Sequence, residues 1–197
     1  MHSKLIHYLE NNPSDQIAKE VKDTMESGRY EYFCEVLTKL DERVLYKSLI
    51  HGRTHIERVC FLALILSEKL DLSADDTKLL LTASAYHDIG RKNEFVDAEH
   101  GLRAAEVVGR YVDYEGDDLK ILRASIEAHS RSDSMISDVI DKYDIADVER
   151  ALKITRILKD ADALDRVRIF DLNTKYLRFE ESHGLVDLAK ILFRSYR

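Results

Sequence analysis

The chain contains few residues that interrupt helices, with one proline and seven glycines among 197 residues. No stretch alternates cleanly between polar and apolar residues, as a half-buried β-strand would. These two absences favour an all-α fold. The sequence also lacks internal repeats, low-complexity tracts and Pro/Ser-rich linkers. We therefore predict a single helical domain over residues 1–197.

Cysteine and long apolar runs are scarce as well. Cys34 and Cys60 are the only cysteines and lack the spacing of a metal site, so we expect both to be reduced in a cytoplasmic protein. The longest apolar run, residues 59–66, is too short to cross a bilayer. The first residues show no apolar core typical of a secretory signal. We expect no membrane partner.

Basic residues are scattered along the chain and the formal net charge is −7. A protein built to hold long nucleic acid needs a basic stripe, so we expect no such partner. A negatively charged protein can still bind a phosphate locally, where a cation and a few arginines dominate the site. The charge therefore permits a small phosphorylated ligand.

Apolar periodicity and the positions of glycine and proline predict the helices. The expected ranges are about 2–11, 14–26, 30–50, 54–70, 74–88, 98–112, 117–130, 134–142, 147–169 and 172–194, with a break near His183-Gly184 in the last.

Four of these helices each carry one metal-type side chain on the apolar face. His55, for example, shares a stripe with Val59, Leu62 and Leu66. The same spacing places three further residues inward: His87, His129 and Asp162. Burying such groups without partners costs several kcal/mol, so they need a shared partner. A metal ion held between facing helices is the simplest one.

The adjacent residues His87 and Asp88 could both bind the same ion. Neighbouring helical residues point about 100° apart, so both side chains reach one ion only near a helix end. Gly90 is well placed to end the helix there. Asp97 is predicted as the N-cap of the next helix, which puts His100 in its first turn.

The order His … His-Asp … Asp resembles the HD-domain superfamily of metal-dependent phosphohydrolases. The resemblance rests on His55 in His51-Gly-Arg-Thr-His-Ile-Glu-Arg-Val59, on the pair His87-Asp88 and on Asp162 in Lys159-Asp-Ala-Asp-Ala-Leu-Asp-Arg166. Glu99-His-Gly101 and Ile126-Glu-Ala-His-Ser130 resemble the additional histidines of the two-metal branch. The resemblance covers about residues 50–170 and implies a helical bundle with the metal site in its core. Residues 1–50 and 170–197 are expected to add helices around this bundle.

The resemblance implies one ion bound by His55, His87, Asp88 and Asp162, with Asp88 bridging to a second ion on His100 and His129. The site would hold one ion or two. Its mixture of nitrogen and carboxylate ligands indicates manganese, iron, nickel or zinc rather than calcium. Such ions activate water and stabilise an in-line phosphoryl transfer, which makes Asp88 a catalytic residue. His100 and His129 have an alternative role, as groups that support the ligands.

Several polar residues follow the ligands directly. Arg91, Lys92 and Arg131 are candidates for binding phosphate oxygens, and Arg91 also has a catalytic part in this scheme. The alternative for Arg91 is a cation that closes the helix C-terminus. Asp97 or Glu94 is the candidate general acid.

Four further residues lie near the ligands in the sequence: His51, Arg58, Asp160 and Asp165. His51 has a capping or substrate role, or is a loop histidine. Arg58 is a salt-bridge partner or a functional group. Either Asp160 or Asp165 could orient a ligand histidine, but exposed charges are the default expectation for both.

The predicted function is hydrolysis of a nucleotide-like phosphate ester or anhydride. The chain lacks the Gly-Tyr-Pro motif of cyclic di-GMP phosphodiesterases, and Arg91-Lys92-Asn93 occupies the region where alarmone hydrolases carry a Glu-Asp pair. The alternatives are a two-iron oxygenase on the same fold, or a metal-binding regulatory module without turnover. The sequence does not define the oligomeric state.

Overall fold

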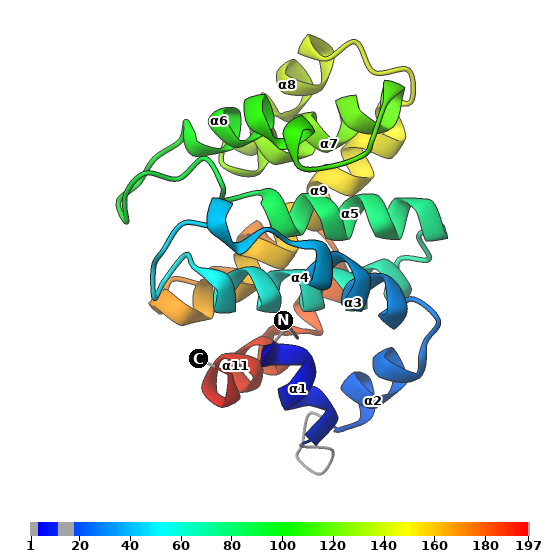
Figure 1. The fold of residues 1–197 in the computed structure, drawn as a ribbon, viewed down its shortest axis with the longest axis vertical. Coiled ribbons are helices and arrows are strands. Elements are labelled where there is room, and N and C mark those ends of the chain that lie inside the picture. The colour runs from blue at the N-terminus through cyan, green and yellow to red at the C-terminus, as the bar shows by residue number, and fades with distance from the viewer. Residues whose placement is uncertain (1–3, 12–17, 197) are drawn as a thin grey trace.

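The computed structural model describes residues 4–11 and 18–196. Over these residues the chain forms helices and no strand, which confirms the all-α prediction (Figure 1). The α-helices are α1 (Lys4–Asn11), α2 (Ala18–Glu26), α3 (Tyr30–Lys39), α4 (Arg53–Lys69), α5 (Ala74–Tyr86), α6 (His100–Val107), α7 (Gly116–His129), α8 (Ile136–Lys142), α9 (Val148–Leu164), α10 (Glu180–His183) and α11 (Val186–Ser195). Five 3₁₀ turns join them: η1 (Glu42–Val44), η2 (Val108–Arg110), η3 (Asp133–Met135), η4 (Asp165–Ile169) and η5 (Thr174–Tyr176).

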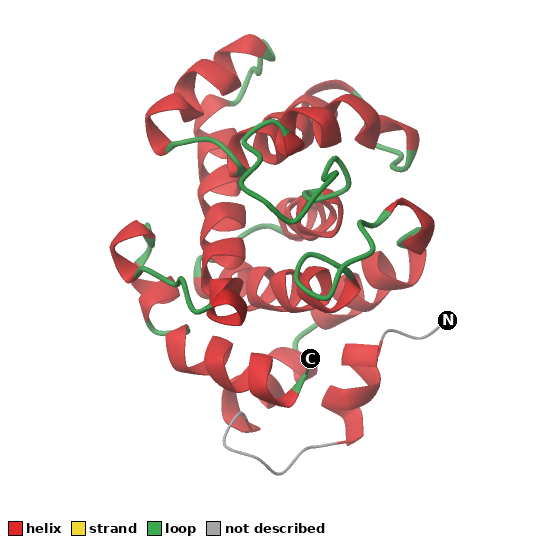
Figure 2. Ribbon diagram, turned by 90° about the vertical axis from the view of Figure 1, so that its left-hand side faces the viewer, coloured by secondary structure: helices red, strands yellow, loops and turns green. Residues whose placement is uncertain are grey.

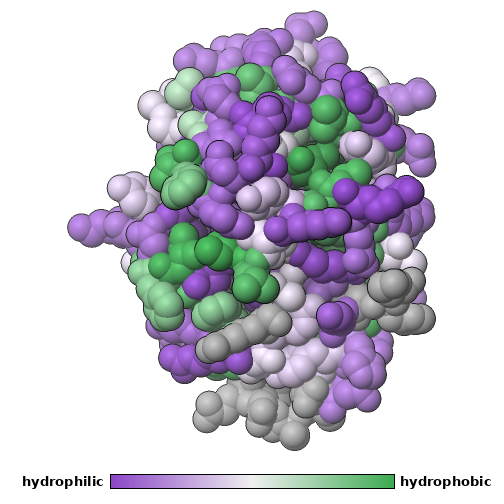
Figure 3. Space-filling model, turned by 60° about the vertical axis from the view of Figure 1, so that its left-hand side comes forward, coloured by the Kyte–Doolittle hydropathy of each residue, from purple (hydrophilic) through white to green (hydrophobic). Residues whose placement is uncertain are grey.

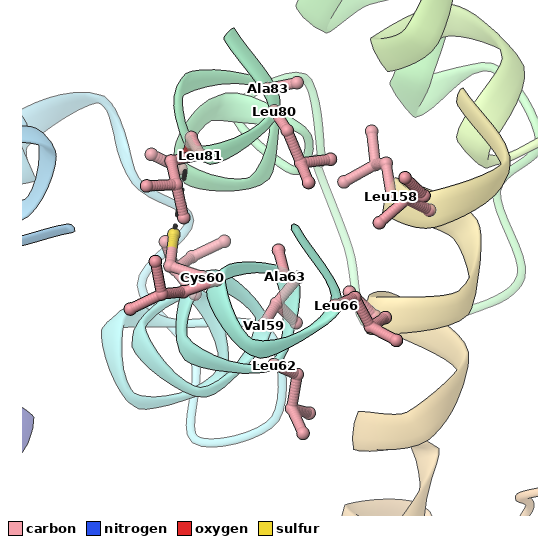
Figure 4. Packing of buried hydrophobic residues seen from close by; sticks show 14 of the residues in the cluster. Val59, Cys60, Leu62, Ala63, Leu66, Leu80, Leu81, Ala83 and Leu158 are labelled. Atoms are coloured by element: carbon pink, nitrogen blue, oxygen red, sulfur yellow. Dashed lines mark hydrogen bonds between the residues drawn. The ribbon is translucent and has the colours of Figure 1, made fainter. Parts of the chain in front are cut away.

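Helix α4 is the centre of the fold, because every residue from position 55 to position 67 is buried. A helix that is buried on all sides belongs inside the core rather than on its surface. It packs against α5 and α9, and more lightly against α1, α2, α3 and α11. Side chains of α4, α5 and α9 meet in the core, among them Leu66, Leu80 and Leu158 (Figure 4).

The ends of these core helices lie on one side of the molecule. The start of α4 and the end of α5 both lie at the left in Figure 1, where the loop after α5 projects from the bundle. Viewed from that side, α5 is seen along its axis with loops gathered in front of it (Figure 2). Polar side chains near these helix ends can therefore meet at one place.

The helix predicted over 30–50 is wrong beyond residue 39. Leu40 adopts extended backbone angles, and the Asp41 carboxylate accepts the backbone N–H of Arg43 to start η1. Ser48 Oγ then accepts the backbone N–H groups of Ile50 and His51, each at 2.9 Å. Asp and Ser side chains that bind nearby backbone N–H groups compete with the helix, which explains the error.

The helix predicted over 172–194 is wrong in its first half, where the chain forms η5 and the short α10 instead. Buried Asp160 of α9 accepts the backbone N–H groups of Arg178 and Phe179 at 2.8 and 3.1 Å. These are donors that a continuous helix would use internally, so a contact from a distant helix prevents it.

The remaining differences are at helix ends. Helix α5 ends at Tyr86 rather than at residue 88, α6 begins at His100, and α9 gives way to η4 at Asp165. The starts predicted at residues 2 and 14 lie outside the described residues. Among the helices the structure describes, none has the length and apolar character needed to cross a membrane.

Candidate metal centre

Six side chains predicted to bind metal come from five elements and converge at the ends of the core helices. His55 lies in the first turn of α4 and His87-Asp88 follow the last residue of α5. His100 begins α6, His129 ends α7, and Asp162 lies in the last turn of α9. The structure brings all six together, as the sequence pattern predicts.

The first group of ligand atoms is formed by His55, His87 and Asp162. The Nε2 atoms of the two histidines lie 3.2 Å apart. Asp162 Oδ1 lies 3.5 Å from His55 Nε2 and 3.9 Å from His87 Nε2. Two nitrogens bound to one ion at about 2.1 Å each are roughly 3 Å apart, so the spacing suits a shared cation.

Asp88 lies between this group and a second one. Its Oδ2 atom lies 3.7 Å from His55 Nε2 and 3.8 Å from His87 Nε2. Its Oδ1 atom lies 3.0 Å from His100 Nε2 and 3.7 Å from His129 Nε2. One carboxylate therefore presents one oxygen to each pair of histidines, which is the arrangement of a bridging ligand.

The other ring nitrogen of each histidine is already bound to an acceptor. His87 Nδ1 donates to the Ser84 carbonyl at 2.7 Å, and His129 Nδ1 donates to the Ile126 carbonyl at 2.5 Å. His100 Nδ1 donates to the Asp97 carbonyl. His55 Nδ1 lies 2.7 Å from Asp165 Oδ2. With the proton on Nδ1, the Nε2 lone pairs of the neutral rings all point into the site.

Converging Nε2 lone pairs of this kind could hold a cation. His100 Nε2 and His129 Nε2 are only 2.8 Å apart, and neither nitrogen carries a proton when Nδ1 is the donor. Unprotonated nitrogens at this distance repel each other and have lost their hydration. A divalent transition metal removes both costs, and the set of imidazoles and carboxylates is the one such metals prefer. The residues fit the cation that the sequence predicts.

The surroundings also hold the ligands in the protonation states that metals need. Burial, with Arg168 nearby, lowers the pKa of His55 well below its usual value. Burial lowers the pKa of His129 to about 4. For Asp88 and Asp162, burial acts to raise the pKa, but the surrounding imidazoles, His87 first, outweigh it and hold both pKa values well below normal.

Comparison with protein families gives the same assignment. A family model described as HD domain matches residues 52–167, more than half of the chain. The chain belongs to the HD-domain family. Members of this family are mostly metal-dependent phosphohydrolases and typically bind divalent metals. Comparisons with curated proteins and with solved structures gave no match.

Two glycines of the HD domain let the ligands approach one another. A Cβ atom on Gly90 would lie 2.2 Å from the His100 carbonyl oxygen, and one on Gly101 would lie 2.6 Å from the Ile126 carbonyl oxygen. Gly90 therefore packs against α6 rather than capping α5, which ends four residues earlier. The helix ends before Gly90 rather than at it, and close backbone packing explains this glycine.

The three residues predicted to bind phosphate occupy different positions. Arg91 Nε lies 3.2 Å from Asp88 Oδ2 and its Nη2 lies 3.4 Å from His100 Nε2, so this guanidinium faces the metal site. Lys92 is exposed in the following loop. Arg131 donates to Glu99 at 2.6 Å, so the structure pairs it with a surface carboxylate beside the site.

Asp97 shapes the loop before α6. Its Oδ1 atom accepts the Glu99 N–H at 3.1 Å and its Oδ2 atom accepts from Arg103. Glu99 rather than Asp97 is the N-cap residue, because the helix begins at His100. Burial acts to raise the pKa of Asp97, but the bond from Arg103 outweighs it and lowers that pKa. An ionised carboxylate is a poor proton donor, and the catalytic role of Asp97 stays a prediction.

Two residues at the site were not among the predicted ligands or phosphate groups. His51 is buried, with Nδ1 3.2 Å from Asp88 Oδ2. Arg168 Nη2 lies 3.2 Å from the same nitrogen, and Arg168 Nε donates to the Ile50 carbonyl at 2.9 Å. The four-residue spacing of His51 and His55 could have indicated that His51 faces the site. No pattern in the sequence indicates the same for Arg168.

Asp160 and Asp165 are both buried, so the default expectation of exposed charges is wrong. Asp165 accepts from His55 and also from Arg58, whose Nε and Nη2 lie 2.6 and 3.0 Å from its oxygens. Arg58 is thus a salt-bridge partner. A carboxylate behind a ligand histidine fixes the ring and increases its basicity, which makes Asp165 a positioning residue.

Lys159 supports the opposite side of the site. Its Nζ donates to the carbonyls of Ala128, His129 and Arg131 at 3.0, 3.2 and 2.6 Å. The Ala128 and His129 carbonyls lie at the end of α7, where no further helical turn supplies donors, and Arg131 follows in the next segment. One buried ammonium thereby fixes the end of the helix that carries His129. The three-residue spacing of Lys159 and Asp162 on α9 and of Asp165 at the start of η4 was the signal for this shared face.

Proposed function

We propose that this HD-domain protein is a divalent-metal-dependent phosphohydrolase that acts on a nucleotide-like phosphate ester or anhydride. The observation that supports it most is Asp88, which presents one oxygen to His55 and His87 and the other to His100 and His129. A mixed imidazole and carboxylate centre of this kind, with arginines at its edge, suits phosphoryl transfer.

In this proposal His55, His87, Asp88 and Asp162 would hold one ion, and Asp88, His100 and His129 would hold a second. Bound divalent ions supply Lewis acidity and lower the pKa of a coordinated water. The buried histidines hold their Nε2 lone pairs fixed, because each Nδ1 is bound to a carbonyl or to Asp165. The protein therefore binds metal without having to reorder these side chains.

Two arginines border the ligands and suit phosphate oxygens. The Arg91 and Arg168 side chains are 10% and 5% exposed, so both are directed at the site rather than at solvent. Arg91 contacts Asp88, and Arg168 contacts His51, which in turn contacts Asp88. Two guanidinium groups near one carboxylate favour an anionic ligand, which would take over part of their pairing.

An exposed ring next to Arg91 favours a substrate with a planar apolar part. The Phe95 carbonyl accepts from Arg91 at 3.3 Å, and the Phe95 side chain is 80% exposed. On the side of the molecule that Figure 3 brings forward, hydrophobic patches lie between strongly hydrophilic ones. Exposed rings of this kind can stack on a nucleobase.

A turnover screen tests the proposal. The protein is supplied with Mn²⁺, Fe²⁺, Ni²⁺ or Zn²⁺ and assayed against nucleoside mono-, di- and triphosphates, cyclic nucleotides and simple phosphate esters. We expect metal-dependent hydrolysis that favours nucleotides over simple esters. An iron-loaded, coloured protein that consumes oxygen and releases no phosphate would favour the two-iron oxygenase instead. Metal binding with no turnover of any substrate would favour the regulatory module.

Replacing Arg91 by alanine should lower kcat/KM for the best substrate about 10- to 100-fold. The estimate follows from the loss of charge-assisted hydrogen bonds to phosphate, each about 1.5–3 kcal/mol. Steady-state kinetics measures the effect, and metal titration shows whether the ion is retained. Lys92→Ala, at the exposed neighbouring position, should change kcat/KM less. Equal kinetics for wild type and Arg91→Ala would remove Arg91 from the phosphate site.

A further inference from the structure

Glu57 carries a buried carboxylate two residues after the ligand His55, and its partners come from both ends of the described chain. Arg53 Nε donates to Oε1 at 2.7 Å from the preceding turn of α4. The Leu5 backbone N–H of α1 donates to Oε2 at 3.3 Å, and the Tyr196 hydroxyl donates to the same oxygen. Glu57 is 0% exposed, so loss of a partner leaves its charge poorly compensated.

The next residue of α4 depends on the same tyrosine. Arg58 Nη1 donates to the Tyr196 backbone carbonyl at 3.0 Å, while Nε and Nη2 bind Asp165. The Arg58 guanidinium also lies over the Phe193 ring of α11, 5.4 Å from its centroid. Arg58 is 1% exposed, so the segment around Tyr196 seals the guanidinium from water on the side away from the ligands.

We propose that Tyr196 is a positioning residue of the metal centre, acting on His55 through Arg58 and Asp165. Its carbonyl and the Asp165 carboxylate hold the same guanidinium, and Asp165 in turn accepts the His55 Nδ1 proton at 2.7 Å. Its hydroxyl fixes Glu57 one residue before Arg58. This inference rests on the metal centre of the proposed function.

The segment that completes the centre lies outside the part of the chain that matches the HD family, which ends at residue 167. Tyr196 is nevertheless buried, and its ring lies 6.1 Å from that of Tyr8 in α1. Burial and the neighbouring Glu57 raise the pKa of Tyr196, so the hydroxyl stays protonated and remains a donor. Figure 1 shows α1 and α11 near each other beside α4, where these contacts form.

The test is metal binding by the full chain with Tyr196→Ala and Tyr196→Phe. Tyr196→Ala keeps the backbone carbonyl but removes the hydroxyl bound to Glu57 and the ring packed on Tyr8, which together hold that carbonyl against Arg58. We therefore expect Tyr196→Ala to weaken Mn²⁺ affinity about tenfold, in the range for groups that orient ligands, and Tyr196→Phe, which removes only the hydroxyl, to weaken it less. Titration against a chromogenic chelator measures the affinity without substrate. Nitrogen-15 NMR of the histidine rings should show loss of the protected His55 Nδ1 proton. Tyr196→Phe keeps the ring and provides the test if Tyr196→Ala does not fold.

Two controls separate positioning from general stability. Tyr176→Phe alters a tyrosine that is 67% exposed in η5. Ile140→Val destabilises the buried face of α8 without touching the contacts around Tyr196. Both should bind Mn²⁺ like wild type. Unchanged Mn²⁺ affinity and an unchanged His55 signal in the Tyr196 variants would overturn this inference alone. A wild-type protein that binds no metal would overturn the metal centre as well.

Discussion

Replacing Asp88 by alanine should abolish metal-dependent hydrolysis, with a fall in kcat/KM of about a thousandfold or more. Among the described residues, Asp88 is the carboxylate that lies within 4 Å of all four of His55, His87, His100 and His129. Without it, both groups of ligands lose an oxygen. An ion that stabilises the transition state by several kcal/mol accounts for a factor of this size. Kinetics together with elemental analysis of the dialysed protein measures the loss.

The matched control is Asp187→Ala, which removes an exposed carboxylate that pairs with Lys190. It should leave both activity and metal content unchanged. Full activity in Asp88→Ala with normal metal content would show that the chemistry takes place elsewhere. Partial activity restored by excess metal would instead place Asp88 among the ligands of a single weakened site.

Replacing Arg58 by alanine should produce the largest loss of stability among the residues behind the site. The change leaves Asp165 buried without its main cation and the Tyr196 carbonyl without its donor. Breaking one partner of a buried ion pair costs about 3–5 kcal/mol. In a chain of this length each kcal/mol lowers Tm by about 2–4 °C, so we expect a fall of roughly 6–20 °C. Thermal unfolding followed by circular dichroism measures it.

Arg43→Ala is the control for this effect, because Arg43 also makes a two-bond pair with one carboxylate. Arg43 Nε and Nη2 each lie 2.8 Å from Asp41 oxygens, but the arginine side chain is 89% exposed. Exposed ion pairs contribute less than about 1 kcal/mol to the free energy of unfolding, so the Tm of Arg43→Ala should change little. Equal shifts in the two variants would mean that the Arg58–Asp165 pair does not depend on burial for its strength.

The ligands could be predicted from the sequence because helix periodicity fixes which face a residue occupies. His55 shares a stripe with Val59 and Leu62 on α4, and all three are buried as expected. The same reasoning turned Asp162 inward, and its Oδ1 atom lies 3.5 Å from His55 Nε2. Periodicity carries no information about which helix ends meet. The order of the motif supplied that, through its resemblance to the HD family.

The sequence offered Asp160 or Asp165 as an alternative that orients a ligand histidine, which Asp165 does, but it could not show their burial or the other supporting contacts, because these join distant segments. Asp160 and Asp165 have the composition of an exposed helical surface, and only the packing of residues 178–179 and of α4 buries them. Tyr196 is 138 residues from Arg58, and no pattern within either helix links the two. The same kind of contact explains the wrong helix at 172–177, since Asp160 captures backbone donors that propensity assigns to a helix.

The central claim is that the side chains around Asp88 bind a transition metal, and anomalous diffraction from crystals grown with Mn²⁺ tests it most directly. The account predicts a manganese peak within bonding distance of His55 Nε2, His87 Nε2, Asp88 and Asp162, and a second between Asp88, His100 and His129 if two ions are bound. Manganese found only at surface carboxylates, with these six side chains free of metal, would contradict it.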